Sequence, residues 1–171
     1  MLCLTETWWT KALWWNTWRP RYSRRGCGTA IYMKKKIRFV VLTDLTLNLD
    51  YVESIFIKIL TRLSYFAVGV CYKPPNLNLD KLMKFLEGRL SWLGFGGGNV
   101  VVCGDFNLDL LSLNENSSSQ VFYNAMNAIS LIPSIFKPTR IAGSSCMLID
   151  NIFATNLSAF SLGIYIGSLF N

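Results

Sequence analysis

The chain has 171 residues, of which 51% are hydrophobic and 16% are charged; this is too apolar for a disordered polypeptide and long enough for a domain with a sizeable core. Its net charge of +7 favours a polyanionic partner, either nucleic acid or an anionic membrane surface. The five cysteines form no Cys-x-x-Cys pair and the chain has no histidine, which excludes zinc sites of mixed cysteine and histidine ligands and indicates the reduced thiols of an intracellular protein.

The beginning of the chain predicts short strands separated by a loop. Residues 2–5 are typical of a buried strand that ends at Glu6, and the aromatic and basic residues 8–26 are typical of a loop. Residues 28–33 and 37–42 are apolar enough to form two strands, and the lysine-rich segment between them predicts a hairpin with a charged turn.

The rest of the chain predicts longer elements. Alternating or continuous apolar patterns indicate strands at 52–59, 65–72, 99–103 and 147–155, and one-sided apolar faces indicate helices at 79–93 and from 117 onward. This order of many strands with two helices between them predicts an α/β fold of mixed sheets. We find no internal repeat or interdomain linker and expect one domain over 1–171.

The end of the chain is uncharged from Asn151 onward and is about long enough to span a bilayer. Asparagine, threonine, serine and glycine interrupt its apolar residues, so we expect a strand and a loop here and no membrane partner.

Polar side chains occur where a buried strand ends or is interrupted, which is where α/β folds present groups to a substrate. Each of them also has a plain structural explanation, such as capping a turn or pairing within the core. These candidates are Glu6, Tyr72, Asp105, Asn107, Thr139, Arg140, Asp150 and Asn151.

Six motifs occur in a specific order along the chain. They are Thr5-Glu6-Thr7-Trp8, Arg25-Gly26-Cys27-Gly28, Tyr72-Lys73-Pro74-Pro75-Asn76, Gly104-Asp105-Phe106-Asn107-Leu108-Asp109, Lys137-Pro138-Thr139-Arg140-Ile141 and Ile149-Asp150-Asn151-Ile152-Phe153. In this order they resemble the endonuclease domain of LINE-type (non-LTR), jockey-like retrotransposons. That domain belongs to the exonuclease–endonuclease–phosphatase superfamily.

The resemblance implies a four-layer α/β sandwich of two mixed β-sheets flanked by helices, and a hydrolase that cuts DNA phosphodiester bonds to leave a 3′-hydroxyl. It implies Mg²⁺ or Mn²⁺ held by Glu6, a water oriented or deprotonated by Asp105, and donation by Tyr72 to a phosphate oxygen or the leaving group. Asn107 would bond the scissile phosphate or the water, and Asp150 would orient a catalytic neighbour. Contacts to phosphate or DNA are implied for Thr139, Arg140 and Asn151. No small-molecule cofactor is implied, the oligomeric state is left open, and the site of action would be intracellular, in the nucleus.

This sequence also departs from the family pattern. The family begins with an earlier strand and ends with a Ser-Asp-His motif, so we expect a fold truncated at both ends, with its first and last strands missing. The chain has no histidine to fill the role of the one in that motif, and removing a general acid or base typically costs about 10²–10⁴-fold in rate.

Three functions therefore remain open. The first is a metal-dependent DNA endonuclease of retrotransposon origin that is impaired or inactive. The second is a decayed, non-catalytic fragment that at most binds DNA. The third is an inositol or lipid phosphodiesterase, which the motifs around Glu6 and Thr139 disfavour.

Overall fold

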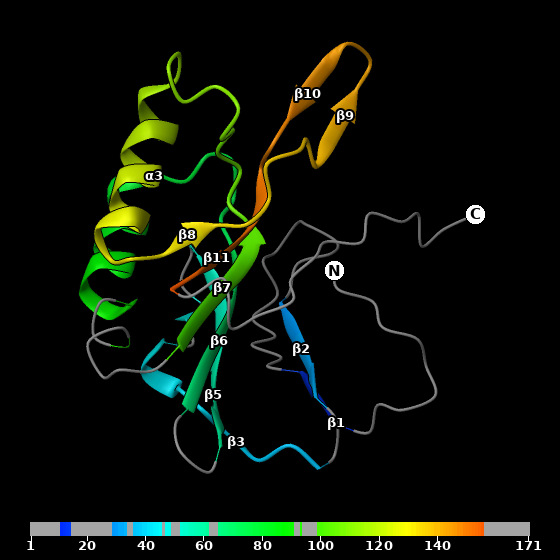
Figure 1. The fold of residues 1–171 in the computed structure, drawn as a ribbon, viewed down its shortest axis with the longest axis vertical. Helices are drawn as coiled ribbons and strands as arrows, with labels where there is room; N and C mark the ends of the chain where they lie inside the picture. The colour runs from blue at the N-terminus through cyan, green and yellow to red at the C-terminus, as the bar shows by residue number, and fades with distance from the viewer. Residues whose placement is uncertain are drawn as a thin grey trace.

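A mixed β-sheet of seven strands dominates the computed structural model, which describes residues 11–14, 29–33, 36–45, 47–48, 52–61, 65–90, 93 and 99–155. The strand order is β3-β5-β6-β7-β11-β8, and β4 pairs with β5 beside β3. Only β6 and β7 of these neighbours run parallel (Figure 1). The strands are β3 (Phe39–Val41), β4 (Leu47–Asn48), β5 (Glu53–Leu60), β6 (Tyr65–Tyr72), β7 (Asn99–Asp105), β8 (Ile132–Pro133) and β11 (Asp150–Ala154).

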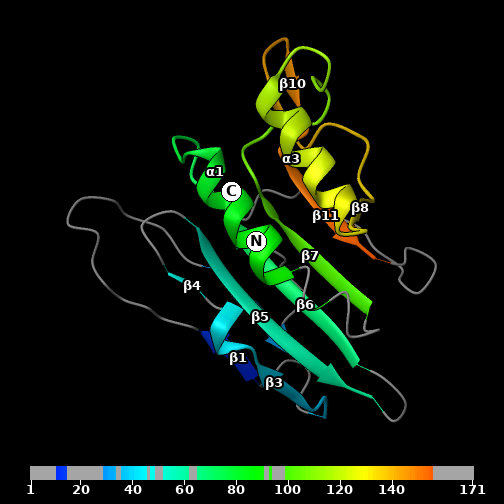
Figure 2. The ribbon, with the colours of Figure 1, turned by 90° about the vertical axis from the view of Figure 1, so that its left-hand side faces the viewer.

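Helices cover one face of this sheet (Figure 2). They are α1 (Leu79–Phe85), which continues as the π-helical turn η2 (Leu86–Leu90), and α3 (Ser117–Ala128); a short 3₁₀ turn, η1 (Thr43–Leu45), joins β3 to β4. Asparagines begin both α-helices as N-caps: the side chain of Asn78 accepts from the backbone N–H of Asp80 at 2.7 Å, and that of Asn116 accepts from Ser118 and Ser119.

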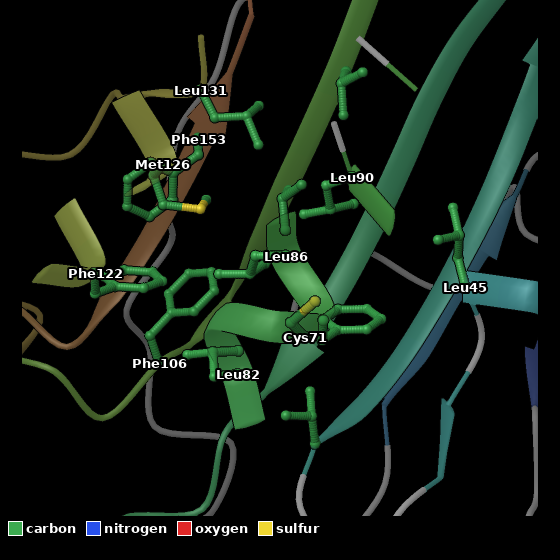
Figure 3. Packing of buried hydrophobic residues seen from close by; sticks show 14 of the residues in the cluster. Leu45, Cys71, Leu82, Leu86, Leu90, Phe106, Phe122, Met126, Leu131 and Phe153 are labelled. Carbon is green, nitrogen blue, oxygen red and sulfur yellow. The ribbon is translucent and has the colours of Figure 1, made fainter. Parts of the chain in front are cut away.

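The core beneath these helices is built on aromatic rings. Phe106, Phe122 and Phe153 point toward one another (Figure 3), with ring centroids 5.0 to 5.6 Å apart. All three are at most 1% exposed, and edge-on or tilted packing of this kind stabilises a core beyond the area it buries. Leu82, Leu86 and Met126 from the helices fill the space around them.

A small second sheet packs on the opposite face. It consists of β1 (Lys11–Trp14) and β2 (Ala30–Met33), which pair antiparallel. Ile31 and Met33 of β2 pack against Ile55 and Ile57 of β5, and Figure 1 shows the pair on the side of the large sheet away from α3. The expected sandwich of two sheets flanked by helices is therefore confirmed. The described residues form three of its layers: the helices, the large sheet and the small sheet.

Two predictions from sequence were wrong. The expected hairpin between residues 28–33 and 37–42 does not form, because β2 pairs with β1 whereas β3 pairs with β5 of the other sheet. The segment 8–26 is not loop throughout, because Lys11–Trp14 supplies the strand that pairs with β2. The predicted helix over 79–93 does form: it is α-helical from Leu79 to Phe85 and π-helical from Leu86 to Leu90.

A hairpin near the end of the chain stands away from the body of the fold. Its strands are β9 (Arg140–Ala142) and β10 (Ser145–Met147), and Gly143 in the turn has φ of 60°, a backbone conformation that favours glycine. The hairpin rises from the end of the large sheet where β7 finishes and β11 begins (Figure 1). Among the described residues, no helix is both long and apolar enough to cross a membrane.

Candidate functional site

One end of the large sheet carries a row of polar side chains. Tyr72, the last residue of β6, is in register with Asp105, the last residue of β7, and Asp105 is in register with Asp150, the first residue of β11. Side chains in register on neighbouring strands share a face and have Cβ atoms about 4.5–5.5 Å apart. The alternation of buried residues places this row on the face that carries the small sheet. The structure thus brings three of the predicted residues together, and each is half-buried.

Glu53 extends the row to a fourth strand. It is the first residue of β5, is in register with Tyr72, and is 8% exposed. Sequence reasoning gave it no role, although a signal was present. Ile55 and Ile57 follow at a spacing of two and form the face of β5 that packs on the small sheet, so a carboxylate on that face had to be buried.

Asp105 and Asn107 are fixed relative to each other by the backbone between them. The carboxylate of Asp105 accepts from the backbone N–H of Asn107 at 3.0 Å, and the side-chain amide of Asn107 donates to the carbonyl of Lys73 at 2.8 Å. Phe106, between them, is anchored in the aromatic core. Asn107 has φ of 49°, a left-handed conformation that asparagine tolerates better than most residues and that often marks a functional site.

Thr139 and Arg140 lie at the base of the exposed hairpin, close to the start of β11. The hydroxyl oxygen of Thr139 accepts from the backbone N–H groups of Ile149 and Asp150, at 3.3 and 3.1 Å. Thr139 therefore fixes the backbone from which the Asp150 side chain extends. The side chain of Arg140 is exposed, and its positive charge acts on Asp105.

Asn151 is not part of the row. It follows Asp150 directly in a strand and so points to the other face of the sheet. It is 1% exposed, its amide donates to the carbonyl of Ile135 at 2.9 Å, and its oxygen accepts from the N–H of Ile135 at 3.2 Å. In this arrangement Asn151 secures the segment that follows β8.

Burial and neighbouring charges set the electrostatics of the row. Burial raises the pKa of Asp105, and the negative charge of Asp150 raises it further, while hydrogen bonding by Asn107 and the positive charge of Arg140 oppose the rise. Burial lowers the pKa of Lys73, and the charge of Asp105 partly offsets that effect. The charged form of Asp105 is therefore disfavoured at its position in the row.

The donor chemistry of the row suits a hard divalent cation, because two adjacent carboxylates repel each other until a cation neutralises them. Within the described ranges, however, no three histidine, cysteine, aspartate or glutamate side chains gather closely enough to hold a metal by themselves. Glu6, the predicted metal ligand, lies outside the described residues. Its role stays a prediction.

Comparisons with known proteins bear on the family and the fold. A family model described as "Endonuclease/Exonuclease/phosphatase family" matches residues 1–170, and no curated protein matches the sequence. Among solved structures, the chain is similar to the endonuclease domain of TRAS1, a telomere-specific non-LTR retrotransposon, with a TM-score of 0.58 and 14% identity over 78% of this chain and 64% of that one.

Two further solved structures match with lower scores. They are an endonuclease/exonuclease/phosphatase family protein from Leptotrichia buccalis C-1013-b (TM-score 0.48, 16% identity, 75% of this chain and 54% of that one) and the catalytic domain of human Nocturnin with bound sulfate anion (0.47, 15%, 75% and 52%). The chain thus spans a little under two thirds of the TRAS1 domain and about half of the other two. The likeness to the TRAS1 domain supports the fold, and the match over residues 1–170 shows that this chain belongs to the endonuclease/exonuclease/phosphatase family.

Proposed function

We propose that this chain is a divalent-metal-dependent endonuclease that hydrolyses phosphodiester bonds of DNA. The observation that carries the proposal is the register of three strands, which aligns Tyr72, Asp105 and Asp150 in one half-buried row. Family membership supports hydrolysis of a phosphate ester, and the row supplies an acceptor and a donor of protons where such a reaction needs them.

Asp105 is the group that accepts the proton of the attacking water. Its raised pKa brings it closer to the pH at which a general base works well. Its position is fixed by Asn107, whose backbone N–H it binds. The phenolic hydroxyl of Tyr72, next to it in register, is placed to donate to a phosphate oxygen or to the leaving oxygen.

Asp150 completes the row from the other side. Its negative charge acts on Asp105, and the hydroxyl of Thr139 holds its backbone. The two lone pairs of that hydroxyl already accept from Ile149 and Asp150, so its hydrogen is left to donate, and a phosphate oxygen of the substrate is a suitable acceptor.

Mg²⁺ or Mn²⁺ is the cofactor in this proposal, and Glu6 would hold it. When bound, such an ion neutralises charge that develops on the phosphate. Oxygen ligands of this kind are the ones these ions prefer.

DNA as the substrate rests on charge and on the hairpin. The net charge of +7 favours a polyanion. The hairpin of β9 and β10 rises beside the row (Figure 1) and exposes Arg140 and Ile141, the latter 71% exposed. Next to the row, an exposed cation such as Arg140 is suited to the phosphate backbone of DNA, and an exposed apolar side chain such as Ile141 is suited to a groove. A retrotransposon origin, with action in the nucleus, is supported by the six ordered motifs and by the likeness to the TRAS1 domain.

The absence of histidine bears on the rate. No imidazole of this chain is available to act on the phosphate, so we propose an impaired enzyme, slower by about 10²–10⁴-fold than a site with that group. The same observation favours a second candidate, a non-catalytic protein that binds DNA through its positive charge.

Nicking of supercoiled plasmid DNA in Mg²⁺ separates the two candidates. The first predicts slow nicking that EDTA stops and that Asp105→Asn abolishes. Asp80→Asn, the same chemical change at an exposed position of α1, is the matched control and leaves nicking intact. The second predicts retention of DNA on a filter, weakening steeply with salt, and no nicking by any variant. Nicking by Asp105→Asn at the wild-type rate would refute the first candidate.

A further inference from the structure

Lys73 is a buried cation directly beside the row, and the proposed mechanism gives it no part. It follows Tyr72 and is 3% exposed. Its ammonium group donates to the backbone carbonyls of Pro74 and Pro75, at 3.1 and 3.5 Å, and no ion pair of Lys73 is found among the described residues. A lysine is seldom buried without a reason, because desolvation of the charge is costly.

The two prolines explain why the ammonium points where it does. Proline has no backbone N–H, so Pro74 and Pro75 cannot donate backbone hydrogen bonds and can be held only through their carbonyls. The N–H of Leu77 binds the carbonyl of Pro74 at 3.1 Å. The ammonium of Lys73 holds the same carbonyl and that of Pro75. The side chain of Lys73 thus secures the two residues that follow it.

The backbone of Lys73 connects this segment to the catalytic residues. Its N–H donates to the carbonyl of Asp105 at 2.9 Å, and its own carbonyl accepts from the side-chain amide of Asn107 at 2.8 Å. The proline that follows also restricts the backbone of Lys73 to extended conformations. Both ends of the Asp105–Asn107 turn are therefore held by one residue, whose orientation depends on how its neighbours are held.

We propose that Lys73 is a positioning residue, whose ammonium holds Pro74 and Pro75 so that the Lys73 carbonyl stays directed at the side-chain amide of Asn107. This inference rests on the proposed function for its consequence in catalysis, but its structural part stands independently. A carbonyl that turns away leaves the amide of Asn107 without its partner. Even a small displacement of a catalytic group costs about 10²-fold in rate.

Four variants test whether the Lys73 ammonium positions Asn107. Lys73→Met removes the charge and the hydrogen-bond donors, Lys73→Gln keeps a neutral donor, and Lys73→Arg keeps both the charge and the donors. Lys84→Met, the same change from lysine to methionine at an exposed position of α1, is the control. The kcat and KM for nicking of supercoiled plasmid in Mg²⁺ are measured for each. We expect kcat to fall about 10–10²-fold in Lys73→Met with KM unchanged, to be partly restored in Lys73→Gln, and to be largely restored in Lys73→Arg. Lys84→Met should match the wild type.

The second readout does not depend on activity. The side-chain amide signals of Asn107 in ¹⁵N-labelled protein, assigned by their loss in Asn107→Asp, are expected to shift and to exchange faster with solvent in Lys73→Met but not in Lys84→Met. If the wild type shows no metal-dependent nicking, the proposed function fails, and these signals still decide the role of Lys73. If Lys73→Met does not fold, the comparison of Lys73→Arg with Lys73→Gln replaces it. Unshifted Asn107 signals, or, where the wild type nicks DNA, a kcat of Lys73→Met equal to that of Lys84→Met, would overturn the proposal.

Discussion

Asn107 combines an uncommon backbone conformation with a side chain that the site needs, and two substitutions separate these contributions. Alanine and glycine both remove the amide that donates to the carbonyl of Lys73 at 2.8 Å, a loss worth about 1 kcal/mol of stability. At φ of 49°, alanine has an added cost of roughly 1 kcal/mol for left-handed backbone. Glycine has no such cost, although it adds freedom to the unfolded chain.

We therefore expect Asn107→Ala to lower the free energy of unfolding by about 2 kcal/mol and Asn107→Gly by closer to 1 kcal/mol. Urea denaturation measures both, and an unchanged m-value shows that the unfolded state is comparable. If Asn107 contacts the scissile phosphate or the attacking water as expected, nicking should fall in both variants alike, on the order of 10²-fold, because both lose the same side-chain amide. An alanine variant as stable as the glycine variant would refute the backbone part of this reasoning. Wild-type nicking in either would refute the catalytic part.

Three further predictions concern the strands beneath the row and its charge. A Cβ built on Gly104 would overlap the carbonyl oxygen of Cys71 and lie 2.8 Å from its carbonyl carbon. Gly104→Ala must therefore push β6 and β7 apart, and it should lower the free energy of unfolding by about 3 kcal/mol or more in a urea titration. A decrease below about 1 kcal/mol would show that the two strands are not held this closely. Thr139→Val leaves the N–H groups of residues 149 and 150 without their acceptor and should lower the free energy of unfolding by about 1–3 kcal/mol. Thr139→Ser keeps the hydroxyl and should remain close to wild type. Equal free energies of unfolding for the valine and serine variants would contradict the hydrogen bonds described. Because the folded state raises the pKa of Asp105 above its ordinary value of 3.8, the folded state binds the proton more tightly, and ionisation of Asp105 lowers stability as the pH rises through its folded pKa. In EDTA, the free energy of unfolding of Asp105→Asn should thus rise relative to that of the wild type as the pH increases through the folded pKa of Asp105. A difference between the two free energies that stays constant from acid to neutral pH would show that the carboxylate is not desolvated.

Local patterns predicted the elements of the large sheet well. The apolar run at 65–72 matches β6 and the alternating run at 52–59 matches β5 within a residue, because both are long and flanked by breaks in the pattern. The predicted start of the helix at Leu79 was also correct. The partners of β2 and β3 were not predictable in this way. Each has only three or four residues, and its choice of neighbour depends on side chains far away in sequence, such as Ile55 and Ile57 for β2.

The candidate site was also predictable only in part, because some of its features follow from local sequence and others from the folded chain. Motifs at strand ends predicted Tyr72, Asp105 and Asp150 as candidates, and the register of β6, β7 and β11 brings them together. The period of two along a strand already separates Asn151 from Asp150, since consecutive residues point to opposite faces. The bonds of Lys73 were not predictable, because they depend on a turn whose course only the folded chain shows.

The central claim is that Asp105 directs water onto a phosphodiester of DNA, with the 3′-oxygen as the leaving group. The direct measurement is nicking of plasmid in heavy-oxygen water with Mg²⁺, followed by mass analysis of the new 5′-phosphate. We expect one heavy oxygen in that phosphate and an extendable 3′-hydroxyl from wild-type protein, with neither product from Asp105→Asn. Labelled product from Asp105→Asn at the wild-type rate, or a new 3′-phosphate from wild type, would contradict it.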